Sequence, residues 1–201
     1  LVAAGFPRWR RNDPAQVEIW VFWSGDAAFG LRLTDERFKY RSMKPPKRRG
    51  ALRPTVAGAM ALVASPRDGE VVLDPMCGTG TLLQEAHAAN SRCRLIGSDI
   101  SDEAIRAAVP RLRGMAEVKS RDARSDCLND EPVDCIICNL PWGQQYRVER
   151  GLYRELIENF TRNLTADGRM VLLTDRISLL EEALGDHGWS WKRAARVSVQ
   201  G

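Results

Sequence analysis

The sequence lacks any long hydrophobic run. Among its 201 residues, no apolar stretch approaches the about 20 residues that a helix needs to cross a membrane. Pro7 and three arginines (Arg8, Arg10 and Arg11) interrupt the first residues, which therefore do not have the apolar centre of a signal peptide. We expect no membrane partner and a cytoplasmic location, or a nuclear one in a eukaryote.

Histidine and paired cysteine are also scarce. The chain has two His and five Cys, and an odd number without regular spacing indicates a reduced protein rather than a disulfide scaffold. Cys135 and Cys138 form a Cys-x-x-Cys pattern, but residues three apart on a strand face opposite sides. No second pair or His cluster completes a zinc site. We therefore expect buried cysteines and no metal.

Acidic residues are missing from one long basic segment. Between Arg37 and Arg53 there are eight Lys or Arg residues and no Asp or Glu, although the net charge of the chain is only +4. Pro45 and Pro46 interrupt this segment, which predicts an extended strap rather than a helix. Unpaired charge of this density is typical of contact with a polyanion such as RNA. A solvated linker is the alternative.

What is present is an alternation of strand and helix patterns. Residues 16–23 and 29–33 predict a small hairpin. The later segments predict helices at 54–64, 81–89, from 102, 152–164 and 177–184, and strands at 71–73, 94–97, 116–119, 133–138, 170–173 and 189–199. This alternation predicts an α/β fold, a doubly wound and mostly parallel sheet. We assign residues 1–45 to the hairpin and basic linker, the end of an upstream RNA-binding region, and residues 46–201 to the α/β domain. The start at Leu1 is typical of a fragment, and the early end is typical of a domain truncated at its C-terminus.

A glycine-rich turn joins the first strand of this sheet to its helix. Residues 74–81 read Asp-Pro-Met-Cys-Gly-Thr-Gly-Thr, and glycines let a backbone turn tightly and approach a ligand. Asp74 can attract a cation at the edge where open α/β sheets bind ligands. Asp99 ends the next strand, 21 residues after Gly78, which is the spacing of a carboxylate that accepts from ribose hydroxyls. Asp122, after the third strand, can accept from an adenine amine.

The turn does not fit the two commonest phosphate-binding motifs. A dinucleotide fingerprint needs a third glycine where Leu83 stands, and a Walker loop needs the missing Gly-Lys-Ser/Thr. A purely structural tight turn is the remaining alternative, which the pair of Asp74 and Asp99 disfavours.

A second motif follows the apolar strand at 133–138. Asn139-Leu140-Pro141-Trp142 places an amide oxygen, a backbone carbonyl and a flat ring at one point. The two oxygens can accept hydrogens from an exocyclic amine, and the ring can stack on a base, worth about 1–3 kcal/mol.

The two motifs resemble those of class I S-adenosylmethionine-dependent N-methyltransferases. More narrowly, the chain resembles the THUMP-associated RNA guanine-N2 methyltransferases over nearly its whole length. The narrower resemblance rests on Leu-Arg-Pro-Thr at 52–55, on Glu85 after the glycine turn, and on the hairpin and basic segment. It implies a Rossmann-like class I methyltransferase fold.

The resemblance also implies roles for particular residues. S-adenosyl-L-methionine would be the cofactor, with its methionine part, ribose and adenine held in turn by Asp74, Cys77, Gly78 and Gly80, by Asp99, and by Asp122 with Ala123. Further cofactor contacts would be Arg53, Thr55, Thr79 and Ile100. The target base would be held by Asn139, Leu140, Pro141 and Trp142. Leu140 stands where many members have a second proline, which loosens the backbone but leaves the carbonyl available.

The function implied is methyl transfer to the exocyclic N2 of a guanosine in structured RNA. The RNA would be a tRNA, or alternatively a ribosomal or small nuclear RNA, and some eukaryotic members need a small activating protein partner. Asn139 is neutral, so it would orient and polarise the amine rather than act as a strong base. Two alternatives remain open from the residues: an adenine-N6 methyltransferase on RNA or DNA, and a subunit that binds cofactor or RNA without catalysis.

Overall fold

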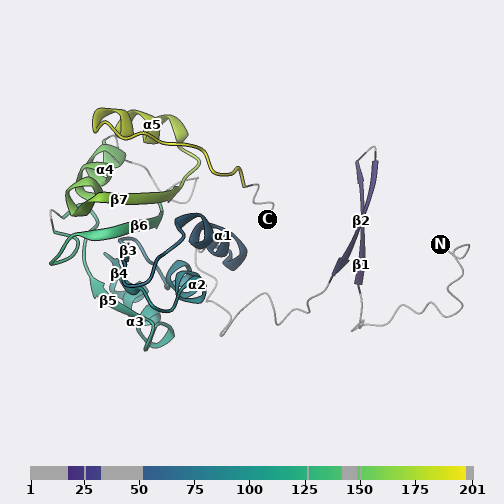
Figure 1. Cartoon of the computed structure of the whole chain (residues 1–201), viewed down its shortest axis with the longest axis horizontal. Coiled ribbons are helices and arrows are strands. Elements are labelled where there is room, and N and C mark those ends of the chain that lie inside the picture. Colours follow the sequence, from purple (N-terminus) through teal and green to yellow (C-terminus); the bar gives the residue numbers. More distant parts are fainter. Residues whose placement is uncertain are drawn as a thin grey trace, which may run out of the picture. The chain divides into compact units, whose positions relative to one another are not determined.

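The chain divides into two compact units, Leu1–Ser42 and Met43–Gly201. The structure, a computed structural model, describes residues 18–24 and 26–32 as backbone, and residues 52–125, 127–141, 149 and 151–197 with their side chains. In the first unit β1 (Glu18–Ser24) and β2 (Asp26–Arg32) pair antiparallel, which confirms the predicted hairpin (Figure 1). The basic segment at 37–51 and the boundary at 45/46 lie outside the described residues.

The second unit is built on a five-stranded sheet. Its strands lie in the order β5-β4-β3-β6-β7, and all neighbouring pairs are parallel. Their bounds are Val71–Asp74 (β3), Arg94–Asp99 (β4), Ala116–Ser120 (β5), Val133–Asn139 (β6) and Leu164–Leu173 (β7). The predicted α/β parallel fold is thereby confirmed.

Helices cover both faces of this sheet (Figure 1). On one face lie α1 (Pro54–Ala64), α2 (Thr81–Ala89) and α3 (Asp102–Arg111), and on the other α4 (Leu152–Asn163) and α5 (Ile177–Asp186). Alternate strand residues enter the two cores, so that Val72 packs with the first set and Leu73 with the second. Cys135 and Cys138 likewise enter opposite cores, which confirms that they do not form a pair.

The strand predicted at 189–199 was wrong for its described part. Residues 189–197 have no regular structure. Trp189 packs against α4 instead, donating its Nε1–H to Thr161 Oγ1 at 2.8 Å, whereas Trp191 is 48% exposed. The alternating pattern therefore does not line a sheet here, because one tryptophan lies against a helix and the next faces solvent.

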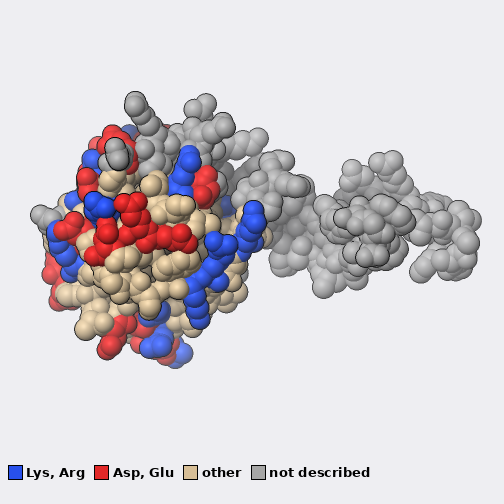
Figure 2. All heavy atoms as spheres, turned by 90° about the horizontal axis from the view of Figure 1, so that it is seen from above, with Lys and Arg blue, Asp and Glu red and all other residues tan. Residues whose placement is uncertain are grey.

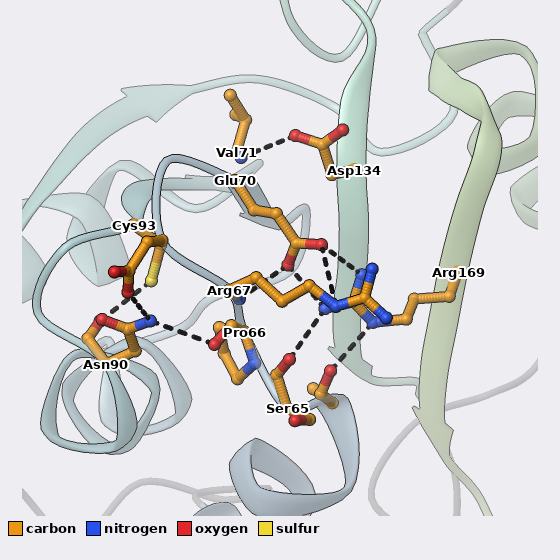
Figure 3. Close-up of polar contacts among 11 residues, drawn as sticks. Ser65, Pro66, Arg67, Glu70, Val71, Asn90, Cys93, Asp134 and Arg169 are labelled. Carbon is orange, nitrogen blue, oxygen red and sulfur yellow. Dashed lines mark hydrogen bonds and ion pairs between the residues drawn. The ribbon is translucent and has the colours of Figure 1, made fainter.

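A network of ion pairs closes the edge where the strands begin, here called the amino edge (Figure 3). Arg169 of β7 donates to both carboxylate oxygens of Glu70, which directly precedes β3, at 2.9 and 2.6 Å. The same guanidinium donates to the carbonyls of Ala64 and Ser65 at the C-terminus of α1. Cationic groups stabilise helix C-termini, so Arg169 joins helix, strand and edge.

Candidate active site

The opposite edge of the sheet, here called the carboxyl edge, gathers the polar residues that the sequence singled out. Asp74, Asp99 and Asn139 are the last residues of β3, β4 and β6. These strands are hydrogen-bonded neighbours and parallel, so their ends meet at one edge. Asp122 follows β5 at the same edge.

Asp99 and the glycine-rich turn hold each other in place. The N–H of Gly78 donates to Asp99 Oδ2 at 2.8 Å, and the N–H of Ser101 donates to Oδ1 at 2.9 Å. The turn is further fixed by the N–H of Cys77, which donates to the Ser98 carbonyl at 2.8 Å. Each oxygen of Asp99 keeps a second acceptor site, so the carboxylate is oriented and still able to bind a hydroxyl.

Two glycines, Gly80 in the turn and Gly97 in β4, are needed for close packing of the turn against its neighbours. Gly80 has φ +84°, and a Cβ there would lie 2.6 Å from Leu112 Cδ1, just after α3. At Gly97 of β4, a Cβ would lie 2.6 Å from Leu83 and 3.1 Å from the Cys77 sulfur. Side chains at these positions would push the turn away from the sheet edge.

Asp74 is a buried carboxyl to which no described Lys or Arg side chain is paired. It is 2% exposed, and burial, with a smaller contribution from nearby Asp99, raises its pKa to about 8 against the lowering effect of the Met76 N–H. Among the described residues, no Lys or Arg side chain lowers this pKa. A cationic ligand group at this edge would supply the missing positive charge.

The cysteines at this edge are not suited to nucleophilic chemistry. Burial is the main cause that raises the pKa of the Cys77 thiol, and the carboxylates Asp74 and Asp99 add to it. Burial likewise raises the pKa of Cys138 well above its ordinary value. Both thiols therefore stay protonated near neutral pH and serve as packing groups.

Several predicted cofactor residues have other contacts. The side chain of Arg124 binds the Asp122 carboxylate at 3.1 Å, which lowers the Asp122 pKa, so a ligand amine would share this carboxylate. Thr79 is buried, and its Oγ1 accepts from Arg111 at 2.9 Å. Ala123 is also buried, with its carbonyl accepting from Asn159 at 3.4 Å.

The remaining predicted cofactor residues are exposed. Ile100 follows Asp99 and is 64% exposed, so it offers an apolar surface beside the ribose-spaced carboxylate. Arg53 precedes α1, where its carbonyl accepts from the N–H groups of Val56 and Ala57, and Thr55 lies in the first turn of that helix.

The Asn-Leu-Pro turn is firmly anchored at the end of β6. The Leu140 N–H donates to the Leu173 carbonyl at 3.0 Å, and the Leu140 side chain is 1% exposed in the core beneath α4. The Pro141 carbonyl accepts from the Tyr153 hydroxyl at 2.9 Å. Packing and these hydrogen bonds hold the backbone at Leu140, where the sequence predicts a looser turn than a second proline would give. Trp142 lies outside the described residues.

Three supporting residues escaped the sequence reasoning. Arg111 binds both Thr79 and Gln84, and thereby joins α3 to the glycine turn and to α2. Tyr153 and Thr174 hydrogen-bond to each other beside Pro141. No local motif marks these contacts, since each joins segments far apart in the sequence.

Two further features of the described part of the chain bear on its chemistry. Its Asp, Glu, His and Cys residues form no cluster of three or more suited to a metal ion. None of its helices has both the length and the apolar character needed to cross a membrane.

Known proteins resemble this chain in fold and in sequence. The crystal structure of TrmN from Thermus thermophilus superposes with a TM-score of 0.69 and 29% identity, covering 83% of this chain and 52% of TrmN. A tRNA (guanine(6)-N2)-methyltransferase of the same species is 32% identical over 99% of this chain and 61% of its own length. The U6 snRNA (guanine-N(2))-methyltransferase THUMPD2 of Bos taurus is 35% identical over 61% of this chain and 25% of its own length.

The chain thus spans between about a quarter and three-fifths of the curated relatives it matches. The matching family model covers residues 41–201 and so includes the glycine turn, Asp99 and the Asn-Leu-Pro turn. The chain belongs to this family, UPF0020, described as the RMKL-like methyltransferase domain.

Proposed function

We propose that this chain is the catalytic domain of an S-adenosylmethionine-dependent RNA methyltransferase that acts on the exocyclic N2 of guanosine. The observation that carries the proposal is the meeting of two sites at one sheet edge. The glycine turn with Asp74 and Asp99 ends β3 and β4, and the Asn-Leu-Pro turn ends the adjacent β6. A methyl donor and an amine acceptor bound there would lie side by side.

The residues at this edge fit the cofactor. At Gly78 a Cβ would meet nothing within 4 Å, so the backbone of the turn is open there to close approach by a ligand. Buried Asp74, whose pKa is raised by desolvation, can pair with the ammonium of the methionine part. Asp99, oriented by the Gly78 and Ser101 N–H groups, can accept from the ribose hydroxyls. When bound, the cofactor supplies an electrophilic methyl group on a sulfonium sulfur.

The Asn-Leu-Pro turn would prepare the amine. The lone pair of an exocyclic amine is delocalised into the base, which makes the nitrogen a poor nucleophile. Hydrogen bonds from the amine to Asn139 Oδ1 and the Leu140 carbonyl would draw it toward tetrahedral geometry and localise the lone pair. Most of the rate would then come from alignment of nitrogen, methyl and sulfur. The cofactor would supply the methyl group and leave with the electron pair of its carbon–sulfur bond, while Asn139 and the Leu140 carbonyl would hold the nitrogen, which would lose one proton to water. No metal ion is required, because the sulfonium already activates the methyl group.

The relatives support guanosine in RNA as the target. The names of the Thermus and bovine relatives both specify guanine-N2, one in tRNA and one in U6 snRNA. We favour tRNA, because the match to the tRNA enzyme extends over 99% of this chain. A guanosine inside a helix would have to be flipped out to reach the turn.

The surface provides one further constraint on RNA contact. On the face shown in Figure 2, a group of acidic side chains lies near the middle and a row of basic ones along the right border, while both signs are scattered over the remaining edges. Arg154 of α4 is paired with acidic residues of α5, including Asp186 at 2.8 Å, so its charge is already balanced within the protein. We therefore propose that the basic segment from Arg37 to Arg53, rather than this face, contacts the RNA phosphates. If the protein is eukaryotic, we also propose that a small activating protein binds it.

The direct test is product analysis with the full-length protein. It is incubated with methyl-labelled S-adenosylmethionine and with separate tRNA and small nuclear RNA transcripts, and the RNA is digested to nucleosides. We expect labelled N2-methylguanosine from tRNA. N6-methyladenosine would overturn the choice of base, and cofactor binding without transfer to any RNA would support a non-catalytic subunit.

A further inference from the structure

The Asn-Leu-Pro turn rests on a buried tyrosine. Tyr153 lies in the first turn of α4, and its side chain packs in the core between this helix and the sheet at 3% exposure. Its hydroxyl reaches the Pro141 carbonyl at 2.9 Å and also contacts Thr174 Oγ1, just beyond β7. A hydroxyl placed in this way connects the end of β6 with the end of β7.

The direction of these hydrogen bonds follows from the number of hydrogens. A tyrosine hydroxyl has one hydrogen, and the Pro141 carbonyl can only accept, so the hydrogen lies between them. The Tyr153 oxygen must then accept from the Thr174 hydroxyl. Thr174 Oγ1 in turn accepts from the Arg176 N–H at 2.9 Å. The chain of donors therefore runs one way, from Arg176 through Thr174 and Tyr153 to Pro141, and such chains strengthen each member.

The preceding residue is held from the same corner. The Leu140 N–H donates to the carbonyl of Leu173, the residue before Thr174, at 3.0 Å. Pro141 has no N–H, and its ring fixes φ. The Leu140 carbonyl thus lies between two anchored groups, the Leu140 N–H before it and the Pro141 carbonyl after it. Rotation of this peptide would break one anchor or the other.

We propose that Tyr153, oriented by Thr174, is a positioning residue that aims the Leu140 carbonyl at the exocyclic amine. The inference rests on the proposed function, which makes this carbonyl an acceptor for the amine. It also explains how Leu140 serves in place of a second proline. The rigidity that a proline ring would give is supplied by the buried leucine side chain and the two hydrogen bonds.

The first test separates positioning from binding in the full-length protein. Tyr153→Phe keeps the buried ring and removes only the hydroxyl, so kcat should fall at least about tenfold through misplacement of the acceptor. The KM for RNA and the affinity for S-adenosylmethionine should change less than about twofold, because the substitution alters neither the glycine turn nor Asn139. Thr174→Val should act in the same direction, Thr174→Ser should restore kcat, and the double variant should be no worse than Tyr153→Phe.

A matched control lies on the same helix. Thr161 near the end of α4 accepts from Trp189 Nε1 at 2.8 Å and does not contact the Asn-Leu-Pro turn. Thr161→Val likewise removes one hydrogen-bonded hydroxyl from α4, so it reports the effect of weakening this helix alone. We expect its kcat to equal that of the parent protein.

A second readout does not depend on activity. Amide hydrogen exchange of the segment containing Leu140 should quicken in Tyr153→Phe and stay unchanged in Thr161→Val. Unchanged exchange, or faster exchange with full kcat, would overturn the positioning role. If the parent protein made N6-methyladenosine, the guanosine proposal would fail, while slower transfer and faster exchange in Tyr153→Phe would still support this inference. If the parent transferred no methyl group at all, the proposed function and this inference would both be overturned.

Discussion

A carboxyl group lies at each end of strand β3, half-buried Glu70 just before it and buried Asp74 as its last residue, and the two have opposite surroundings. Glu70, at the amino edge, meets the Arg169 guanidinium, whose hydrogen bonds lower the Glu70 pKa. Asp74, at the carboxyl edge, accepts from the Met76 N–H, and burial raises its pKa to about 8. The protein itself pairs the carboxylate at the first end with a guanidinium, whereas burial disfavours the charged form of the carboxyl at the second end.

This difference separates stability from function along a single strand. Charge pairing at the amino edge joins α1, β3 and β7, as Figure 3 shows. The carboxyl edge instead combines a desolvated acid with glycines, which lose much backbone freedom on folding. Both features cost stability and are useful only if a ligand compensates. Substitutions at the amino edge should therefore change folding, and those at the carboxyl edge should change binding and catalysis.

The largest effect is expected from removal of Arg169. Arg169→Met leaves Glu70 with 14% of its side chain exposed and without its main partner, and frees two carbonyls at the end of α1. We expect a loss of about 3 kcal/mol in the free energy of unfolding. Urea unfolding measures this, and calorimetry should give unchanged affinity for S-adenosylmethionine in the folded protein. A fall in affinity at full stability would contradict the separation of the two edges.

Two glycines with the same backbone conformation make the comparison sharper. Gly80→Ala introduces a Cβ at φ +84° and 2.6 Å from Leu112, within the glycine turn. The turn relieves this strain by shifting away from its binding geometry. Restoring that geometry on binding costs about 2 kcal/mol, so the affinity for S-adenosylmethionine should be about thirtyfold weaker.

The matched variant is Gly69→Ala at the amino edge, where φ is +79° and a Cβ would meet nothing within 4 Å. It should lower stability and leave cofactor affinity unchanged. Equal losses of affinity in both variants would show that general strain, rather than the position of the turn, sets binding.

The raised pKa of Asp74 predicts pH-dependent binding. Below about 8 the carboxyl is protonated in the free protein, and pairing with an ammonium favours the carboxylate, so binding releases a proton. The affinity for S-adenosylmethionine should rise about tenfold between about pH 6 and pH 7.5, a range in which the α-amino group remains charged.

Calorimetry in buffers with different ionisation enthalpies counts the released proton. In Asp74→Asn the pH dependence should disappear. Stability has the opposite sign: a carboxyl with a raised pKa favours the folded state most at low pH, and this contribution declines as the pH rises toward about 8. A flat binding profile in the parent protein would contradict the assigned role.

The smallest effect concerns acid unfolding at the amino edge. Because the Glu70 pKa is lowered, its contribution is complete above the unfolded pKa near 4.5 and declines as the pH falls through the lower folded value. A partly exposed pair of this kind contributes about 1 kcal/mol or less. Urea unfolding at about pH 5 and pH 3 should show this loss in the parent protein and not in Glu70→Gln. Equal losses in both proteins would assign the acid sensitivity to other groups.

The sequence was sufficient where a feature is local. The glycine turn and Asp99 lie within one strand-helix-strand unit, so spacing alone predicted that both lie at the carboxyl edge. The hydrogen bond from the Gly78 N–H to Asp99 was not predicted. It was insufficient where a residue acts across the sheet. Tyr153 meets Pro141 and Thr174 only because α4 crosses between β6 and β7, and Arg169 finds Glu70 across 99 positions of sequence.

Local propensity also gave one wrong strand. The tryptophans at 189 and 191 alternate like strand residues, yet Trp189 packs against α4 and Trp191 faces solvent. A contact with a helix overrode the β-propensity of this segment.

The most direct test of the account is the variant Asn139→Ala in the full-length protein. Asn139 ends β6 at the carboxyl edge, beside rather than within the cofactor turn. We predict that the rate of N2-methylguanosine formation with saturating cofactor falls at least about 100-fold, because one of two amine acceptors is lost. Affinity for S-adenosylmethionine should stay within a few-fold. Parallel loss of cofactor binding, or undiminished methyl transfer, would contradict the role assigned to this edge.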